Sequence, residues 1–160
     1  MTASSPTGSS LVERLETAAG QRLLSLFFGL PSWAVLGIAV YLTPDARGYG
    51  THQQLGLSTC TLMQLTGYPC PMCGMTTCFT HMAHLEPVGA VVAQPFGVVL
   101  FLTTLLFASI AAVELVSPRR RWQRLWAWVS PREAKVAVGL ILGLTAGWAY
   151  KLWQLGHFSG

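Results

Sequence analysis

Three long stretches of this sequence contain no charged residue. They lie between Arg22 and Asp45, between Glu86 and Glu114, and between Lys135 and Lys151. A soluble domain carries about 25% charged residues, whereas this chain of 160 residues has 10% and a mean hydropathy of +0.48. A helix rises about 1.5 Å per residue, so the second stretch reaches about 40 Å, more than the ~30 Å hydrocarbon layer. We therefore predict an all-α membrane protein.

Three transmembrane helices are predicted, over residues 23–42, 87–116 and 131–155. Pro31 and Pro95 lie inside the first two and predict kinks. The third helix is long enough only if Lys151 extends its amine to the interface. The alternative for the first helix, a cleaved signal peptide, fits less well because its apolar run exceeds the usual 7 to 15 residues. The remaining segments are a tail with an amphipathic helix (1–22), a cysteine-rich loop with a short helix (43–86) and a basic interfacial segment (117–130).

The basic residues predict the orientation, because short loops rich in Lys and Arg remain in the cytoplasm. One side of the predicted bundle holds Arg14, Arg22, Arg119, Arg120, Arg121, Arg124, Arg132 and Lys135, and the other holds Arg47 and Lys151. We therefore expect a multi-pass protein with a cytoplasmic N-terminus and an extracytoplasmic cysteine-rich loop. In the 117–130 segment, Trp122, Leu125, Trp126 and Val129 share one helix face. This pattern indicates interfacial anchoring in the bilayer, with regulated lipid binding as the alternative.

All four cysteines lie in the predicted outward loop, at Cys60, Cys70, Cys73 and Cys78. In an oxidising compartment, neighbouring cysteines form disulfides that hold together a cap too small for a core of its own. Four cysteines allow three pairings, and the sequence does not select one. The first interpretation is therefore a disulfide-stapled cap.

Two other kinds of chemistry fit the same residues. Cys60, Cys70, Cys73 and His84 are candidate ligands for Cu or Zn, although no second CxxC or HxxxH completes a four-ligand pattern. Alternatively, the CxxC pair Cys70 and Cys73 exchanges disulfides, because a thiol near the start of a helix has a lowered pKa. Met75, Cys78 and Met82 share a stripe on a short helix predicted over 75–85, and packing is the favoured role of the two methionines.

Small residues predict helix packing within the bilayer. Gly139, Gly143 and Gly147 recur every four residues in the third predicted helix, and Gly89, Ala93 and Gly97 do so in the second. Such stripes allow backbones to approach closely. We expect these faces to pack on each other or on a partner.

A spaced set of residues around the CxxC pair resembles a known family. The set comprises Thr66, Gly67, Cys70, Pro71, Cys73, Gly74, Thr76, His84, Gln94 and Pro95, with Cys60 and Pro44 upstream. Over about residues 43–97 it is similar to the domain of unknown function 2752 family, small integral membrane proteins with a CPxCG motif. The sequence departs at Met72, where Gly is common, at Thr77, where Arg is common, at Cys78, usually a small apolar residue, and at Gln94, often Asn. The missing Arg removes any anion-binding role from that position, whereas Met72 and Cys78 favour a soft-metal variant. The resemblance implies a membrane protein and supplies no reaction.

The sequence favours a non-enzymatic role. It contains no phosphate-binding loop and no Ser and His with an orienting acid. The net charge of +4 comes mainly from one short arginine cluster, which does not indicate a nucleic-acid binder. We expect an accessory or structural subunit that contacts the lipid bilayer and other membrane protein subunits. A thiol-disulfide oxidoreductase and a Cu or Zn binder are the alternatives.

Overall fold

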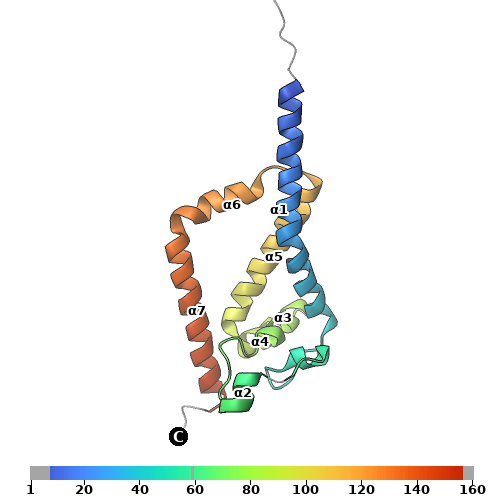
Figure 1. Ribbon diagram of the computed structural model, residues 1–160. Coiled ribbons are helices and arrows are strands. Elements are labelled where there is room, and N and C mark those ends of the chain that lie inside the picture. The colour runs from blue at the N-terminus through green and yellow to red at the C-terminus, as the bar shows by residue number, and fades with distance from the viewer. Residues whose placement is uncertain (1–7, 59, 157–160) are drawn as a thin grey trace, which may run out of the picture.

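A computed structural model describes residues 8–58 and 60–156, so residues 1–7 of the predicted tail lie outside it (Figure 1). Every regular element in the described residues is helical. In chain order they are α1 (Gly8–Tyr41), η1 (Thr51–Leu55), α2 (Thr61–Thr66), α3 (Met75–Ala83), α4 (Pro87–Ala93), α5 (Pro95–Val116), α6 (Arg121–Val129), η2 (Ser130–Arg132) and α7 (Glu133–Gln154). The predicted all-α class is confirmed.

Three segments are long and apolar enough to cross a membrane: Ala18–Tyr41, Pro95–Val116 and Arg121–Gln154. Most of their large apolar side chains are exposed on the outside of the fold, including Leu140, Ile141 and Leu142 of α7. In water such a surface would be unfavourable, whereas lipid tails match it. The chain is a multi-pass membrane protein.

The short helices lie at two opposite ends of the long ones (Figure 1). At one end α6 runs across the molecule and connects α5 to α7; we call this the α6 end. At the other end η1, α2, α3 and α4 lie together beside the C-terminal end of α7; we call this the cysteine end. The predicted loop between the first two spans is therefore a folded unit, with α3 close to the predicted 75–85 helix.

Helix α1 packs mainly on α5. Small residues make the contact close, because a Cβ added at Gly29 would lie 2.8 Å from the Cβ of Ala111. The indole Nε1 of Trp33 donates to the carbonyl of Ala108 across the same interface, at 3.2 Å. Small side chains that bring two helices together, with a hydrogen bond between them, are typical of packing within membranes.

A buried carboxylate holds the corner between α5 and α6. Glu114 is fully buried, and its Oε1 accepts the backbone N–H groups of Arg119 at 2.9 Å and Arg121 at 3.2 Å. Its Oε2 accepts the Arg121 guanidinium at 2.7 Å. Helix starts leave backbone N–H groups without intrahelical partners, and this carboxylate satisfies one of them at Arg121, together with the N–H of Arg119 just before the helix. It thus fixes the direction in which α6 leaves α5.

The span expected over 87–116 is divided in the structure. Residues 87–93 form α4, residues 95–116 form α5, and Gln94 between them is extended, with φ −166° and ψ 102°. Proline disfavours the helical conformation of the residue before it and lacks the N–H that would continue the ladder. Pro95 therefore ends one helix and begins the next, where the sequence analysis expected a kink.

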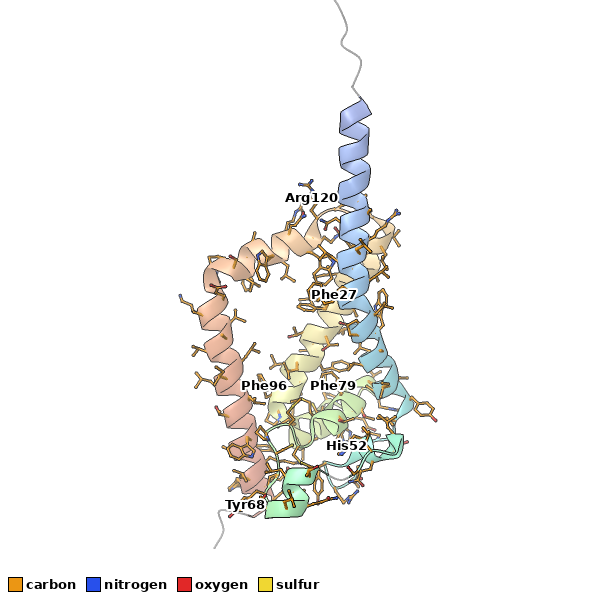
Figure 2. The ribbon with its side chains drawn as sticks, in the orientation of Figure 1. Phe27, His52, Tyr68, Phe79, Phe96 and Arg120 are labelled. Atoms are coloured by element: carbon orange, nitrogen blue, oxygen red, sulfur yellow. The ribbon has the colours of Figure 1, made fainter. Side chains whose placement is uncertain are left out.

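The structure shows what lies against the glycines of the two stripes, which were predicted to pack on each other or on a partner. In α7, Gly143 lies against the ring of Phe96 and Gly147 against the Gln94 side chain, whereas Gly139 has nothing within 4 Å of an added Cβ (Figure 2). Gly89 and Gly97 instead receive side chains of α3, from His81 and Cys78. Two glycines of α7 therefore contact Gln94 and Phe96 at the break between α4 and α5. Gly89 and Gly97 contact side chains of α3.

Candidate functional site

Three of the four cysteines line one pocket of about 220 Å³ at the cysteine end. Cys60 precedes α2, Cys70 follows it, and Cys73 lies one residue before Gly74 at the start of α3. The pocket is also lined by Tyr49, Gly50, His52, Gln53, Met63, Met72, Gly74, Thr76 and Thr77. His52 and Tyr68 mark this end of the molecule in Figure 2. Residues distant in sequence thus meet around the thiols.

The thiols of Cys60 and Cys70 line the same pocket, and each affects the pKa of the other. The pKa of Cys60 is lowered, first by the backbone N–H of Met63 at the start of α2 and further by the Cys70 thiol. The pKa of Cys70 is raised, first by burial and then by its contact with Cys60. Cys60 is therefore the more readily ionised of these two thiols.

The other two cysteines are buried and weakly acidic. Burial raises the pKa of Cys73 to about 11 and that of Cys78 to about 12. Cys78 is outside the pocket and packs with Ala90 and Ala93 of α4. All four cysteines are free thiols in the structure. The expectation that a lowered pKa at the helix start would activate Cys73 is wrong, because desolvation of its thiolate outweighs nearby charges.

His84, the fourth candidate metal ligand, is engaged elsewhere. Its Nε2 makes a 3.0 Å hydrogen bond with the carbonyl of Leu42, and it does not line the thiol pocket. Over residues 8–58 and 60–156, no three His, Cys, Asp or Glu side chains converge in a way that could hold a metal ion. The structure thus brings Cys60, Cys70 and Cys73 to one pocket and leaves His84 and Cys78 apart.

Gly74 of the CPxCG motif occupies a position that excludes a side chain. Its φ is +86°, and an added Cβ would lie 2.7 Å from the carbonyl oxygen of Ala93 and 2.8 Å from that of Gly48. Left-handed backbone conformation and close approach of other backbone atoms both require glycine. The motif therefore places the start of α3 against the end of α4.

Lys151 of α7 reaches the same place and is fully buried. Its Nζ donates to the carbonyls of Gly48 at 3.0 Å and Ala93 at 3.1 Å, and to Oε1 of Gln154 at 2.8 Å. The prediction that this side chain extends to the interface is wrong, because the side chain is fully buried. Three oxygen acceptors satisfy the three donors of the ammonium group, which makes burial of the cation possible.

Side chains near the C-terminal end of α7 cap the C-terminal end of α4. Helix α4 ends at the Gln94 break, so its last carbonyls lack partners in the same helix. Ala93 is satisfied by Lys151, and the carbonyl of Val92 accepts both the Tyr150 hydroxyl and the Gln154 amide, each at 3.2 Å. A cation at a helix C-terminus is also favoured by the helix dipole.

Further polar contacts hold the CPxCG segment in place. The indole of Trp148 donates to the carbonyl of Pro69 at 2.8 Å, and the Gln94 amide donates to that of Pro71 at 3.4 Å. The Oε1 of the fully buried Gln94 has no hydrogen-bond partner in the described residues. The hydroxyls of Thr51 and Thr77 share a 2.8 Å hydrogen bond that joins η1 to α3. The residues on either side of Cys70 are thus attached to α7 and to the break between α4 and α5.

Sequence reasoning missed the parts played by Lys151 and Trp148. Lys151 offered a signal, because an ionisable residue in an apolar helix is usually buried for a purpose. Its acceptors could not be identified, since Gly48 and Ala93 are 103 and 58 positions away. Trp148 gave no comparable signal among six tryptophans.

Comparison with known proteins bears on the same segment. Residues 60–108 match the model of a family described as "Protein of unknown function (DUF2752)". The match begins at Cys60 and includes the three pocket cysteines, α3, α4 and part of α5. No curated protein and no solved structure matches the chain. The predicted family resemblance is therefore confirmed: residues 60–108 of this membrane protein are similar to that family.

Proposed function

We propose that this chain is a non-enzymatic accessory subunit of a membrane complex, with an outward cap closed by a disulfide between Cys60 and Cys70. The single observation that carries the proposal is that these two thiols, which come from either side of α2, line the same pocket. In an oxidising compartment neighbouring thiols form a disulfide. Closing so short a loop stabilises the folded state by about 3 kcal/mol.

Charge supports the outward orientation of the cysteine end. Arg119, Arg120, Arg121, Arg124, Arg132 and Lys135 belong to the α6 end, whereas Arg47 and Lys151 belong to the cysteine end. Basic residues in short loops remain in the cytoplasm. The α6 end is then cytoplasmic, as is the N-terminus, and the thiol pocket faces the outer compartment.

The remaining polar groups of the cysteine end support a structural role. The Lys151 ammonium is occupied by three oxygen acceptors, and the Trp148 indole by a backbone carbonyl. The raised pKa of Cys73 keeps its thiol neutral and a poor nucleophile near pH 7. These groups hold the cap to the long helices, which leaves the apolar faces of α7 for lipid or for a partner subunit.

Thiol-disulfide exchange is a second candidate function, favoured by the presence of Cys73 in the pocket of Cys60 and Cys70. In that reaction a partner dithiol transfers two electrons to the Cys60–Cys70 disulfide through a mixed disulfide. The partner leaves oxidised, and Cys60 and Cys70 become thiols. The lowered pKa of Cys60 makes it the better attacking thiol in the reverse direction.

The oxidation state of each cysteine tests the proposal. Membranes are treated with N-ethylmaleimide before and after reduction, and the peptides are analysed by mass spectrometry. We expect a Cys60–Cys70 linked peptide together with unlinked Cys73 and Cys78. Cys60→Ser, Cys70→Ser and the double variant should lower protein abundance to the same extent, because each removes the same bond. Cys73→Ser is the matched control and should keep the linked peptide.

Other outcomes select the alternatives. Normal abundance of Cys70→Ser, with a partner protein trapped on Cys60 in a mixed disulfide, would establish exchange. Near-stoichiometric Cu or Zn in the purified wild type, lost in Cys70→Ser, would establish a metal site. Free Cys60 and Cys70 thiols in untreated membranes, with no metal and no trapped partner, would refute the disulfide cap.

A further inference from the structure

An apolar pocket of about 610 Å³ lies at the α6 end, remote from the cysteines. The inner face of α6 lines it with Trp122, Trp126 and Val129, α1 contributes Leu24 and Phe28, and α5 contributes Phe107. The rings of Phe28, Phe107 and Trp122 pack together at centroid distances of 5.0 to 6.1 Å. These three packed rings form one apolar side of the pocket. Trp126, which also lines the pocket, is 69% exposed.

A second, more polar pocket adjoins the first. Leu24 and Gln123 line both, and the second also contains Gln21 and Phe27 of α1. Gln21 is only 4% exposed, and its Oε1 has no hydrogen-bond partner in the described residues. A buried acceptor without a donor is costly, which indicates a donor from outside the chain.

Exposed arginines belong to the same segments of α1 and α6 that line these pockets. Arg120 and Arg124 of the α6 segment are exposed, as is Arg22, the residue after Gln21. Arg121 is instead paired with Glu114. Figure 2 shows Arg120 at the α6 end, beside α1 and above Phe27. An apolar cavity, an unsatisfied acceptor and exposed arginines thus occur together at the α6 end.

We infer that these pockets bind one anionic phospholipid with a hydroxylated headgroup, of the phosphatidylglycerol class. An acyl chain fits the apolar pocket, the phosphate lies near the exposed arginines, and a headgroup hydroxyl donates to the Gln21 amide oxygen. Each basic residue near an anionic lipid contributes about fivefold in affinity. The amphipathic α6 holds the lipid at the interface, and the site is independent of the state of the cysteines.

Lipid titration of the purified full chain tests this inference. The protein is washed in neutral detergent and titrated with phosphatidylglycerol or phosphatidylcholine, and bound lipid is counted by native mass spectrometry. We expect one retained phosphatidylglycerol and a weaker, non-saturating association of phosphatidylcholine. Inorganic phosphate at the same concentration should not compete, because it has no acyl chain. Equal binding of the two lipids, or displacement by phosphate, would overturn the inference.

Three variants and one control assign the parts of the site. Leu24→Trp fills the apolar pocket and should abolish the retained lipid. Arg124→Gln should weaken phosphatidylglycerol about fivefold and leave phosphatidylcholine unchanged. Gln21→Leu should remove the preference for phosphatidylglycerol over phosphatidic acid, which lacks the headgroup hydroxyl. Lys135→Gln, an exposed basic residue at the start of α7, is the matched control and should bind as the wild type does.

Two further measurements distinguish a loss of lipid binding from misfolding and from self-association: the melting temperature and the oligomeric state. Arg124 and Lys135 are both exposed, so both glutamine variants should keep the wild-type melting temperature even if Leu24→Trp does not. An equal loss of affinity in these two variants would indicate a general charge effect and no site. A persistent dimer without bound lipid would show that a second copy fills the pocket, which also contradicts the inference.

Discussion

Lys151 is a cation enclosed by neutral oxygen atoms, with no carboxylate among the three groups to which it donates. It also lies over the ring of Tyr49, 5.7 Å from the centroid. Carbonyl dipoles and an aromatic face both stabilise a positive charge. The residue therefore combines two tasks, since it satisfies the end of α4 and joins α7 to the 48–50 segment.

Replacing Lys151 tests this double task. Lys151→Met retains the length of the side chain but leaves the carbonyls of Gly48 and Ala93 without their donor. An unsatisfied buried acceptor costs about 1–3 kcal/mol, so we expect the free energy of unfolding to fall by about 2–3 kcal/mol. Denaturation of the purified protein in mixed micelles with increasing dodecyl sulfate measures the change. Lys135→Met, at an exposed position, should change stability by less than about 0.5 kcal/mol; a similar loss in both would argue against the assigned role.

The four thiols should differ in their reaction with iodoacetamide. After reduction at pH 8, Cys60 should be alkylated first, because its pKa is lowered, and Cys73 and Cys78 last, because theirs are raised to about 11 and 12. Only the thiolate reacts, so alkylation of Cys73 should accelerate as the pH rises towards 11. Peptide mass spectrometry follows each site over time. Equal rates for Cys60 and Cys73 at pH 8 would contradict the burial of Cys73.

The same shifts give a direction for stability. An unfolded thiol ionises near its ordinary pKa of about 8.5, whereas folded Cys73 keeps its proton until about pH 11. Between these values the unfolded state has released a proton that the folded state retains. The free energy of unfolding of the reduced protein should therefore fall as the pH rises from about 9 to 11. Below about pH 9 the burial of the neutral Cys73 thiol should not reduce it.

At the scale of elements, the break at Gln94 determines how α7 packs. The break places Phe96 and the Gln94 side chain on the side of α5 that meets α7, where Gly143 and Gly147 admit them (Figure 2). A continuous helix over 87–116 would not present this pair of side chains in the same way. The packing of α7 is thus a consequence of the proline that divides the neighbouring span.

Two glycines on α7 provide a matched comparison. Gly143→Leu should clash with Phe96, and overpacking of this kind costs about 1–3 kcal/mol. Gly139→Leu meets nothing within 4 Å and should be neutral or slightly stabilising. Because both changes remove a glycine from the same helix, the gain in helix propensity of ~1 kcal/mol cancels in the comparison. Thermal unfolding in detergent measures both; equal melting temperatures would contradict the α5–α7 contact.

Elements whose formation depends on local pattern were predictable, and contacts between distant segments were not. Charge-free runs predicted the three long helices because lipid requires apolar length. The extended conformation of Gln94 follows from a rule about the residue before proline, and the sequence analysis underestimated it as a kink. Gly89 and Gly97 were expected against the glycine stripe of the third span or against a partner, and within this chain they lie against side chains of α3. A stripe of small residues does not predict which helix packs against it.

At the scale of the whole molecule, the charges divide the two ends. The chain has two lysines, Lys135 near the α6 end and the buried Lys151 at the cysteine end. This distribution permits a test of orientation that leaves the cysteines intact. Leu57→Lys adds an amine at an exposed position of the cysteine end, while Lys135 reports on the other end.

An impermeant amine reagent applied to intact cells should label position 57 and spare Lys135. After lysis Lys135 should also react, whereas Lys151 should remain unlabelled until the protein is denatured. Peptide mass spectrometry distinguishes the three positions. Labelling of Lys135 in intact cells, with position 57 protected, would place the α6 end outside.

The attachment of α7 to the cysteine end also sets an order of assembly. Trp148 and Lys151 supply donors to the carbonyls of Pro69, Gly48 and Ala93, yet they are synthesised long after those residues. Because translation proceeds from the N-terminus, the cap waits for its final helix with open thiols and unpaired carbonyls. On the proposed outward orientation, Cys60 and Cys70 would be open to oxidation during this interval. A chain that ends before Trp148 should lack these three contacts, so we expect it to be less stable than the full chain and more readily degraded.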